Sequence, residues 1–144
     1  MLITIPLRYI PKHLSKKDKN IIRKELKKSR KQYKNRKYHT RKRVKSFKSK
    51  TSSHILNARK MYKTQKIGPT RELARKTGCS LKGLKAIEKK GMGAYYSSGS
   101  RPNQTAQSWG RARLASAITG GKSAAVDFHI IEKECKKDRK AYIE

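Results

Sequence analysis

Acidic residues are scarce in this sequence of 144 residues, which has nine Asp and Glu against 40 Lys and Arg. The formal net charge of +31 at pH 7 implies strong repulsion within the free chain. A polyanion would relieve that repulsion, so we expect nucleic acid, an anionic membrane surface or an acidic protein surface as the partner. A soluble monomer that simply tolerates a very basic surface is the less favoured alternative.

Apolar residues are also few, at 34% of the chain, so any hydrophobic core must be small. The apolar start "MLITIPLRYIP" is too short to span a membrane and is interrupted by Pro6 and Pro11. It does not have the order of charged, apolar and small residues that marks a signal peptide. We predict an extended strand that pairs with a neighbouring molecule, with a surface tail as the alternative.

Cysteine and histidine give little sign of metal binding. The two cysteines, Cys79 and Cys135, have no partner at a metal-ligand spacing, and the four histidines are scattered. We therefore predict no structural zinc site and no cofactor. Two isolated thiols fit a reducing compartment better than a disulfide framework.

No arrangement of residues typical of catalysis is present, so we do not expect an enzyme. The turn "GSRPNQT" could bind an anion, but it does not have the G-K-[ST] ending of a P-loop. Asp127 and His129 are two positions apart and would face different sides of a helix. A hydrolase needs a base oriented by a third group beside its nucleophile.

The positive charge is densest near the N-terminus, where residues 1–50 hold 20 of the Lys and Arg and two acidic residues. We interpret residues 1–52 as a basic arm with one helix at about 15–34. Ser15 and Asp18 resemble a capping box, and Ile22, Leu26 and Tyr33 form a narrow apolar stripe. Residues 35–53 show no period, which predicts disorder in the free protein, with binding along a phosphate backbone or between the subunits of an assembly as alternatives.

Residues 53–134 are predicted to form a small helical domain, whose first helix covers 53–63. Residues 70–90, within "TRELARKTGCSLKGLKAIEKKG", have the pattern of a helix-turn-helix. Gly78 would adopt the left-handed conformation of the turn, and Ser80 would cap the second helix. Leu73, Ala74, Cys79, Leu84 and Ile87 would form the core of this unit. Thr77 stands where a larger apolar residue is expected.

The second helix of this unit presents lysines to solvent. Lysine contacts phosphates as a mobile point charge, and the helix contains no Arg, Asn or Gln that could contact a base bidentately. If the unit is functional, the sequence predicts DNA binding with poor sequence preference. The alternative is a helix pair that serves only for packing.

Residues 93–121, "GAYYSSGSRPNQTAQSWGRARLASAITGG", contrast with the rest because they contain three basic residues and no acidic one. We expect Gly91 and Gly93 to end the preceding helix and residues 94–105 to form a loop, in which Gly99 takes a special backbone angle. Helices are predicted at 106–119 and 123–134, the second capped by Ser123, followed by a charged tail at 135–144. Tyr95, Tyr96 and Trp109 are interpreted either as core or as a surface for partner packing.

The run "KKGMGAYYSSGSRPNQTAQSWGRARLASAITGGKSAAVDFHII" resembles an uncharacterised family of small basic proteins of large double-stranded DNA viruses of algae and amoebae. The most specific part of the resemblance is "YYSSGSRPNQTAQSW". It implies a virion or viral-factory location and no known activity.

The sequence therefore predicts a mainly α protein with a basic N-terminal arm and a helix-turn-helix-like unit. We expect a virion structural protein, a minor capsid or internal component that is part of a larger assembly and also passes through the host cytoplasm or nucleus. Viral capsid proteins are the expected partners, with double-stranded DNA and an anionic inner membrane surface as further partners. The alternative function is low-specificity DNA binding or condensation. The candidate polyanion-binding residues are Arg41, Lys42, Arg43, Lys45, Lys48, Lys82, Lys85, Lys89, Lys90 and Arg101.

Overall fold

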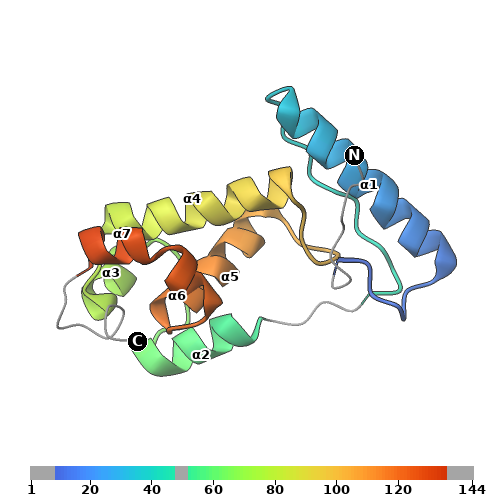
Figure 1. The fold of residues 1–144 in the computed structure, drawn as a ribbon. Coiled ribbons are helices and arrows are strands. Elements are labelled where there is room, and N and C mark those ends of the chain that lie inside the picture. Colours follow the sequence, from blue (N-terminus) through green and yellow to red (C-terminus); the bar gives the residue numbers. More distant parts are fainter. Residues whose placement is uncertain (1–8, 48–51, 136–144) are drawn as a thin grey trace. The chain divides into compact units, whose positions relative to one another are not determined.

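The computed structural model describes residues 9–47 and 52–135, and this part of the chain is mainly α-helical, as predicted (Figure 1). Within the described residues, β pairing is limited to one isolated antiparallel bridge between Cys79 and Cys135. None of the described helices is long and apolar enough to cross a membrane. The helices in chain order are α1 (Lys16–Lys34), α2 (Ser53–Tyr62), α3 (Arg71–Thr77), α4 (Leu81–Ser97), α5 (Ala106–Ile118), α6 (Lys122–Val126) and α7 (Phe128–Glu134).

The chain forms two compact units that do not follow the predicted linear division. The described residues of unit 1 are 9–47 and 93–106, and those of unit 2 are 52–92 and 107–135. The loop that the sequence placed in the helical domain thus belongs with the basic N-terminal residues. The strand predicted for residues 1–11 lies largely outside the described residues.

Helix α1 is the main helix of unit 1, and Ser15 caps it as predicted. The Ser15 hydroxyl accepts a hydrogen bond from the Asp18 N–H at 3.1 Å. The Asp18 carboxylate does not complete the capping box, because it accepts hydrogen bonds from the backbone N–H and hydroxyl of Ser46. Ile22 and Leu26 are buried as expected, whereas Tyr33 is 38% exposed and does not join that core.

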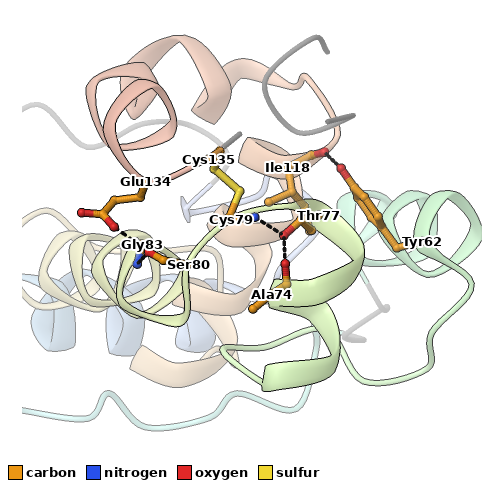
Figure 2. Close-up of a disulfide and its surroundings, with 9 residues drawn as sticks. All are labelled: Tyr62, Ala74, Thr77, Cys79, Ser80, Gly83, Ile118, Glu134 and Cys135. Carbon is orange, nitrogen blue, oxygen red and sulfur yellow. Dashed lines mark hydrogen bonds between the residues drawn. A yellow bond between two sulfur atoms is a disulfide. The ribbon is translucent and has the colours of Figure 1, made fainter. Parts of the chain in front are cut away.

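Unit 2 has its own hydrophobic core, whose buried residues come from five helices, α2, α3, α4, α5 and α7, and from the segments that adjoin them. At one side the Tyr62 hydroxyl at the end of α2 donates a hydrogen bond to the Ile118 carbonyl of α5 at 2.5 Å (Figure 2). The buried residues of this core are Ala58, Tyr62, Ile67, Leu73, Cys79, Leu84, Ile87, Leu114, Ala115, Ala117, Ile118, Ile131 and Cys135.

The helix-turn-helix-like unit has the local geometry that its sequence predicts. Gly78 ends α3 with φ 76°, in the left-handed region, and the Ser80 hydroxyl accepts the Gly83 N–H at 3.0 Å at the start of α4. Thr77 is fully buried although it is polar. Its hydroxyl donates to the Ala74 carbonyl and accepts the Cys79 N–H, so both of its hydrogen-bonding roles are satisfied by backbone (Figure 2).

Helix α4 does not end at Gly91 or Gly93, contrary to the prediction, but continues to Ser97. Gly91 instead marks the place where α4 and α5 approach closely. A Cβ on Gly91 would lie 2.7 Å from the Gly110 Cα, and one on Gly110 would lie 2.7 Å from the Glu88 carbonyl oxygen. Gly91 and Gly110 are therefore explained by the close packing of α4 against α5, and Gly91 does not terminate α4.

The single helix predicted for residues 123–134 is two helices, α6 and α7, separated at Asp127. Asp127 is fully buried, and its carboxylate accepts two hydrogen bonds from the Arg113 guanidinium, at 2.9 and 2.8 Å. These bonds raise the pKa of Arg113, with burial acting in the opposite direction. Ser123 does not cap the helix, because α6 begins at Lys122 after Gly121 and the Ser123 N–H donates to the Ser116 hydroxyl.

Cys79 and Cys135 form a disulfide, so the expectation of two free thiols is wrong. The two residues are 56 positions apart. Cys79 lies in the turn between α3 and α4, and Cys135 directly follows α7. In the fold the two residues form an antiparallel bridge, and their sulfur atoms are bonded (Figure 2). No local spacing in the sequence indicates this pairing.

Candidate polyanion-binding surfaces

The most strongly charged surface of unit 1 is the solvent-facing side of α1. Ile22, Glu25, Leu26 and Ser29 are buried on one side of the 19-residue helix, so the opposite side faces solvent. At about 1.5 Å per residue the helix is roughly 28 Å long. Its exposed basic residues, here called the cationic face, are Lys16, Lys17, Arg23, Lys24, Lys27, Lys28, Lys31 and Lys34.

Both acidic residues of α1 point away from the cationic face and hold the segment that follows the helix. Glu25 accepts the Lys42 N–H at 2.9 Å and contacts His39 Nε2 at 3.0 Å. Burial alone would raise the pKa of Glu25, but these hydrogen bonds outweigh it and the pKa is lowered. The two Ser46 hydrogen bonds likewise lower the pKa of Asp18. Residues 39–46 thus run back along α1 (Figure 1). The two carboxylates of α1 itself bind this segment and do not lie among the exposed lysines of the helix.

Arg41, the first predicted polyanion-binding residue, is engaged inside unit 1. Its guanidinium donates to the Ser29 hydroxyl, the Tyr95 carbonyl and the Ser100 hydroxyl at 2.9, 2.7 and 2.7 Å. It also lies over the Tyr95 ring, 3.7 Å from the ring centroid. Burial lowers the pKa of this guanidinium. Arg41 therefore joins α1 to the end of α4 and the following loop through its guanidinium.

The other predicted residues of unit 1 are exposed. Lys42, Arg43, Lys45 and Arg101 have solvent-facing side chains, and Lys48 lies outside the described residues. Arg43 makes one long hydrogen bond, 3.3 Å, to the Asn103 carbonyl. Asn103 fixes this region, since its side chain accepts the Val44 N–H and donates to the Val44 and Phe47 carbonyls. Asn103 was not among the predicted residues, although an Asn directly after Pro is common in turns.

In unit 2, Lys82, Lys85 and Lys89 are all exposed on α4, spaced so that they share one face. Lys90 is also exposed, and its ammonium lies 2.9 Å from His129 Nε2. The described part of the chain therefore carries two separate sets of surface cations, one in each unit.

The first turn of α4 is covered by the end of α7. The Ser80 N–H and hydroxyl donate to the carbonyl and carboxylate of Glu134, and a Cβ on Gly83 would lie 2.6 Å from the Glu134 Cβ (Figure 2). In helix-turn-helix proteins the N-terminal residues of the second helix contact base edges. Here the Glu134 carboxylate and the Cys79–Cys135 disulfide lie at that position.

The aromatic residues that were predicted to pack against a partner differ in exposure. Tyr95 is 0% exposed and belongs to the core of unit 1, while Tyr96 and Trp109 are half-buried. Tyr33, predicted as part of the apolar stripe of the first helix, and Tyr38, which lies in the basic run predicted either as disordered or as binding a phosphate backbone, are both exposed.

Among the described residues there is no group of three or more His, Cys, Asp or Glu side chains that could hold a metal ion. Asp127 and His129, the pair considered as catalytic, have separate partners, Arg113 and Lys90. In the described part of the chain, the candidate binding surfaces are formed by exposed Lys and Arg side chains and by the exposed Tyr33 and Tyr38.

These features define a small, strongly basic helical protein with two cationic surfaces. The chain belongs to a family of unknown function, DUF5824, whose model matches residues 6–137. Comparison with curated proteins and with solved structures finds no significant match. The family model covers both units of the fold.

Proposed function

We propose that this chain is a structural protein of a large DNA virus particle, a minor capsid or internal component that binds an anionic surface within the assembly. The observation that carries the proposal is the cationic face of α1. It bears eight exposed Lys and Arg, and both carboxylates of the helix are used elsewhere. Like charges spaced three and four residues apart destabilise a helix in the free protein. An anionic partner would remove that repulsion.

The disulfide supports a location in a particle. Disulfides persist in oxidising surroundings, among them the surfaces of virions, and are rare in the reducing cytosol. The Cys79–Cys135 bridge closes a long loop within unit 2. A protein that is assembled into a particle and then exported gains stability from such a bond. The viral context itself rests on the resemblance of the "YYSSGSRPNQTAQSW" segment.

Low-specificity DNA binding is the second candidate, and the row Lys82, Lys85 and Lys89 on α4 favours it. A protein that neutralises Z phosphates of duplex DNA loses affinity with log salt concentration at a slope of about 0.9 Z. Replacing Lys24, Lys27, Lys28 and Lys31 by Gln should lower that slope by up to about 3.6 if the cationic face of α1 binds DNA. The matched variant Lys82→Gln, Lys85→Gln, Lys89→Gln tests the α4 surface in the same way.

Fractionation of purified particles tests the structural role directly. Particles are opened mildly, treated with nuclease and washed with rising salt up to about 1 M, at which electrostatic screening acts within about 3 Å. A capsid component should stay with the shell through both treatments. Release by nuclease alone would contradict the capsid role and support DNA condensation. Absence of the protein from purified particles would refute the proposal both as a minor capsid component and as an internal component.

A further inference from the structure

We propose that unit 1 carries a stacking platform for single-stranded nucleic acid, formed by Tyr33, Tyr38 and Tyr96. Tyr33 lies near the end of α1, Tyr38 in the segment after it, and Tyr96 near the end of α4. The Tyr33 and Tyr38 ring centroids are 6.2 Å apart, and those of Tyr38 and Tyr96 are 4.9 Å apart. Tyr96 in turn packs edge-on against the buried Tyr95 at 5.2 Å.

Hydrogen bonds of the backbone and of neighbouring residues hold the segments that carry the exposed rings. A turn with Arg36 at φ 59° and a hydrogen bond from the Lys37 N–H to the Gln32 carbonyl reverses the chain after α1. The residue after Tyr38, His39, is then fixed by Glu25. The Tyr96 carbonyl accepts a hydrogen bond from the Ser29 hydroxyl at 3.2 Å. Tyr38 is nevertheless 69% exposed, so its ring is positioned without being buried.

The charge around the rings indicates the kind of ligand. The exposed charged side chains nearest in sequence to Tyr33 and Tyr38 are all basic, namely Lys31, Lys34, Arg36 and Lys37, and Glu25 is already paired. Exposed aromatic rings can also bind cations, but these neighbours would repel one. Aromatic rings on which bases stack, beside cations that track a backbone, characterise proteins that bind single strands. Duplex DNA keeps its bases stacked inside and offers no free base faces to the rings.

The test uses the full chain and fluorescence anisotropy with two labelled oligonucleotides of about 12 nucleotides, within the size range of single-strand sites. One is oligothymidylate, and the other is an abasic strand with the same phosphates and no bases. Each base that stacks on a ring adds affinity, so oligothymidylate should bind about tenfold more tightly than the abasic strand or better. Tyr38→Ala should remove most of that preference and leave abasic binding unchanged. Tyr38→Phe should keep the preference, because the ring is retained.

Three results would overturn the proposal: equal binding of the two strands by the unaltered protein, an equal loss for both strands in Tyr38→Ala, or no binding of either. Circular dichroism checks that the variants keep their helices, and Tyr33→Ala provides a second variant at the other end of the cluster. Replacing Lys82, Lys85 and Lys89 by Gln should leave the base preference intact. This inference goes beyond the structural role and is measured on purified protein, so either can fail without the other.

Discussion

Arg41 shows how a residue in a basic run can stabilise the fold. Its neighbours Lys42 and Arg43 are exposed, while its own guanidinium has three neutral acceptors and the Tyr95 ring around it. A planar fork of donors suits that arrangement, and an ammonium group cannot reproduce it. A buried cation that loses such partners costs more free energy than an exposed one.

Arg41→Lys should therefore lower the free energy of unfolding of unit 1 by about 2–3 kcal/mol, since hydrogen bonds from charged groups contribute about 1.5–3 kcal/mol each and are not additive. Denaturant unfolding followed by tyrosine near-ultraviolet circular dichroism measures this. Arg43→Lys is the matched control, with an expected change below about 0.5 kcal/mol. Equal effects in the two variants would argue against the structural role of Arg41.

The lowered pKa of Glu25 predicts that unit 1 loses stability in acid. This pKa is lower in the folded protein than its ordinary value of 4.5. The stability that Glu25 contributes is then complete above that ordinary value and is lost as the pH falls through the folded pKa. Unit 1 of the unaltered protein should lose stability over this acidic range, and Glu25→Gln should show a shallower loss. Glu72→Gln, at an exposed ion pair with Lys76, should leave the pH profile unchanged.

At the scale of elements, the close packing of α4 against α5 explains the glycine at position 91 inside α4. Glycine inside a helix costs about 1 kcal/mol relative to alanine, which is why Gly91 and Gly93 look like a helix end in the sequence. The structure separates the two positions. A Cβ at Gly91 would meet the backbone of α5, whereas one at Gly93 would meet nothing within 4 Å.

Gly91→Ala should consequently destabilise unit 2 by about 1–3 kcal/mol, the usual cost of overpacking, because helix backbones would have to move apart. Gly93→Ala should instead stabilise α4 by about 0.5–1 kcal/mol. Thermal unfolding of both variants beside the unaltered protein measures the difference. A stabilising Gly91→Ala would mean that the close helix approach is absent in solution.

At the scale of the whole molecule, the disulfide ties the turn of the helix-turn-helix-like unit to the end of α7. The cross-link joins residues 56 apart and restricts the unfolded chain strongly. Together with the Ser80–Glu134 contacts, it holds α7 over the first turn of α4. The redox state of the surroundings therefore bears on the stability of unit 2.

Replacing Cys79 and Cys135 by Ser should lower the free energy of unfolding of unit 2 by about 4 kcal/mol, from the loop-closure entropy of this separation. Trp109, the single tryptophan, lies in unit 2 and reports on that unit by fluorescence. Dithiothreitol should destabilise the unaltered protein in the same way and leave the double Ser variant unaffected. An unaltered protein insensitive to reductant would contradict a stabilising disulfide.

The sequence by itself determined the local features of this protein. The caps at Ser15 and Ser80, the left-handed turn at Gly78, the buried Ile22 and Leu26 and the mainly helical class all depend on neighbours a few positions apart. Those interactions are local, so a single sequence records them. The overall charge likewise follows from composition alone, and with it the expectation of an anionic partner.

Only the tertiary structure decided which residues meet across long separations. The Cys79–Cys135 bridge, the Gly91–Gly110 approach and the Arg113–Asp127 pair join residues from different helices. The grouping of residues 93–106 with the basic N-terminal residues is of the same kind. Such contacts depend on how whole elements pack, which sequence periodicity does not encode. That packing engaged the Arg41 guanidinium in hydrogen bonds within unit 1 and left Tyr38 exposed, and so separated structural from surface residues within a single basic run.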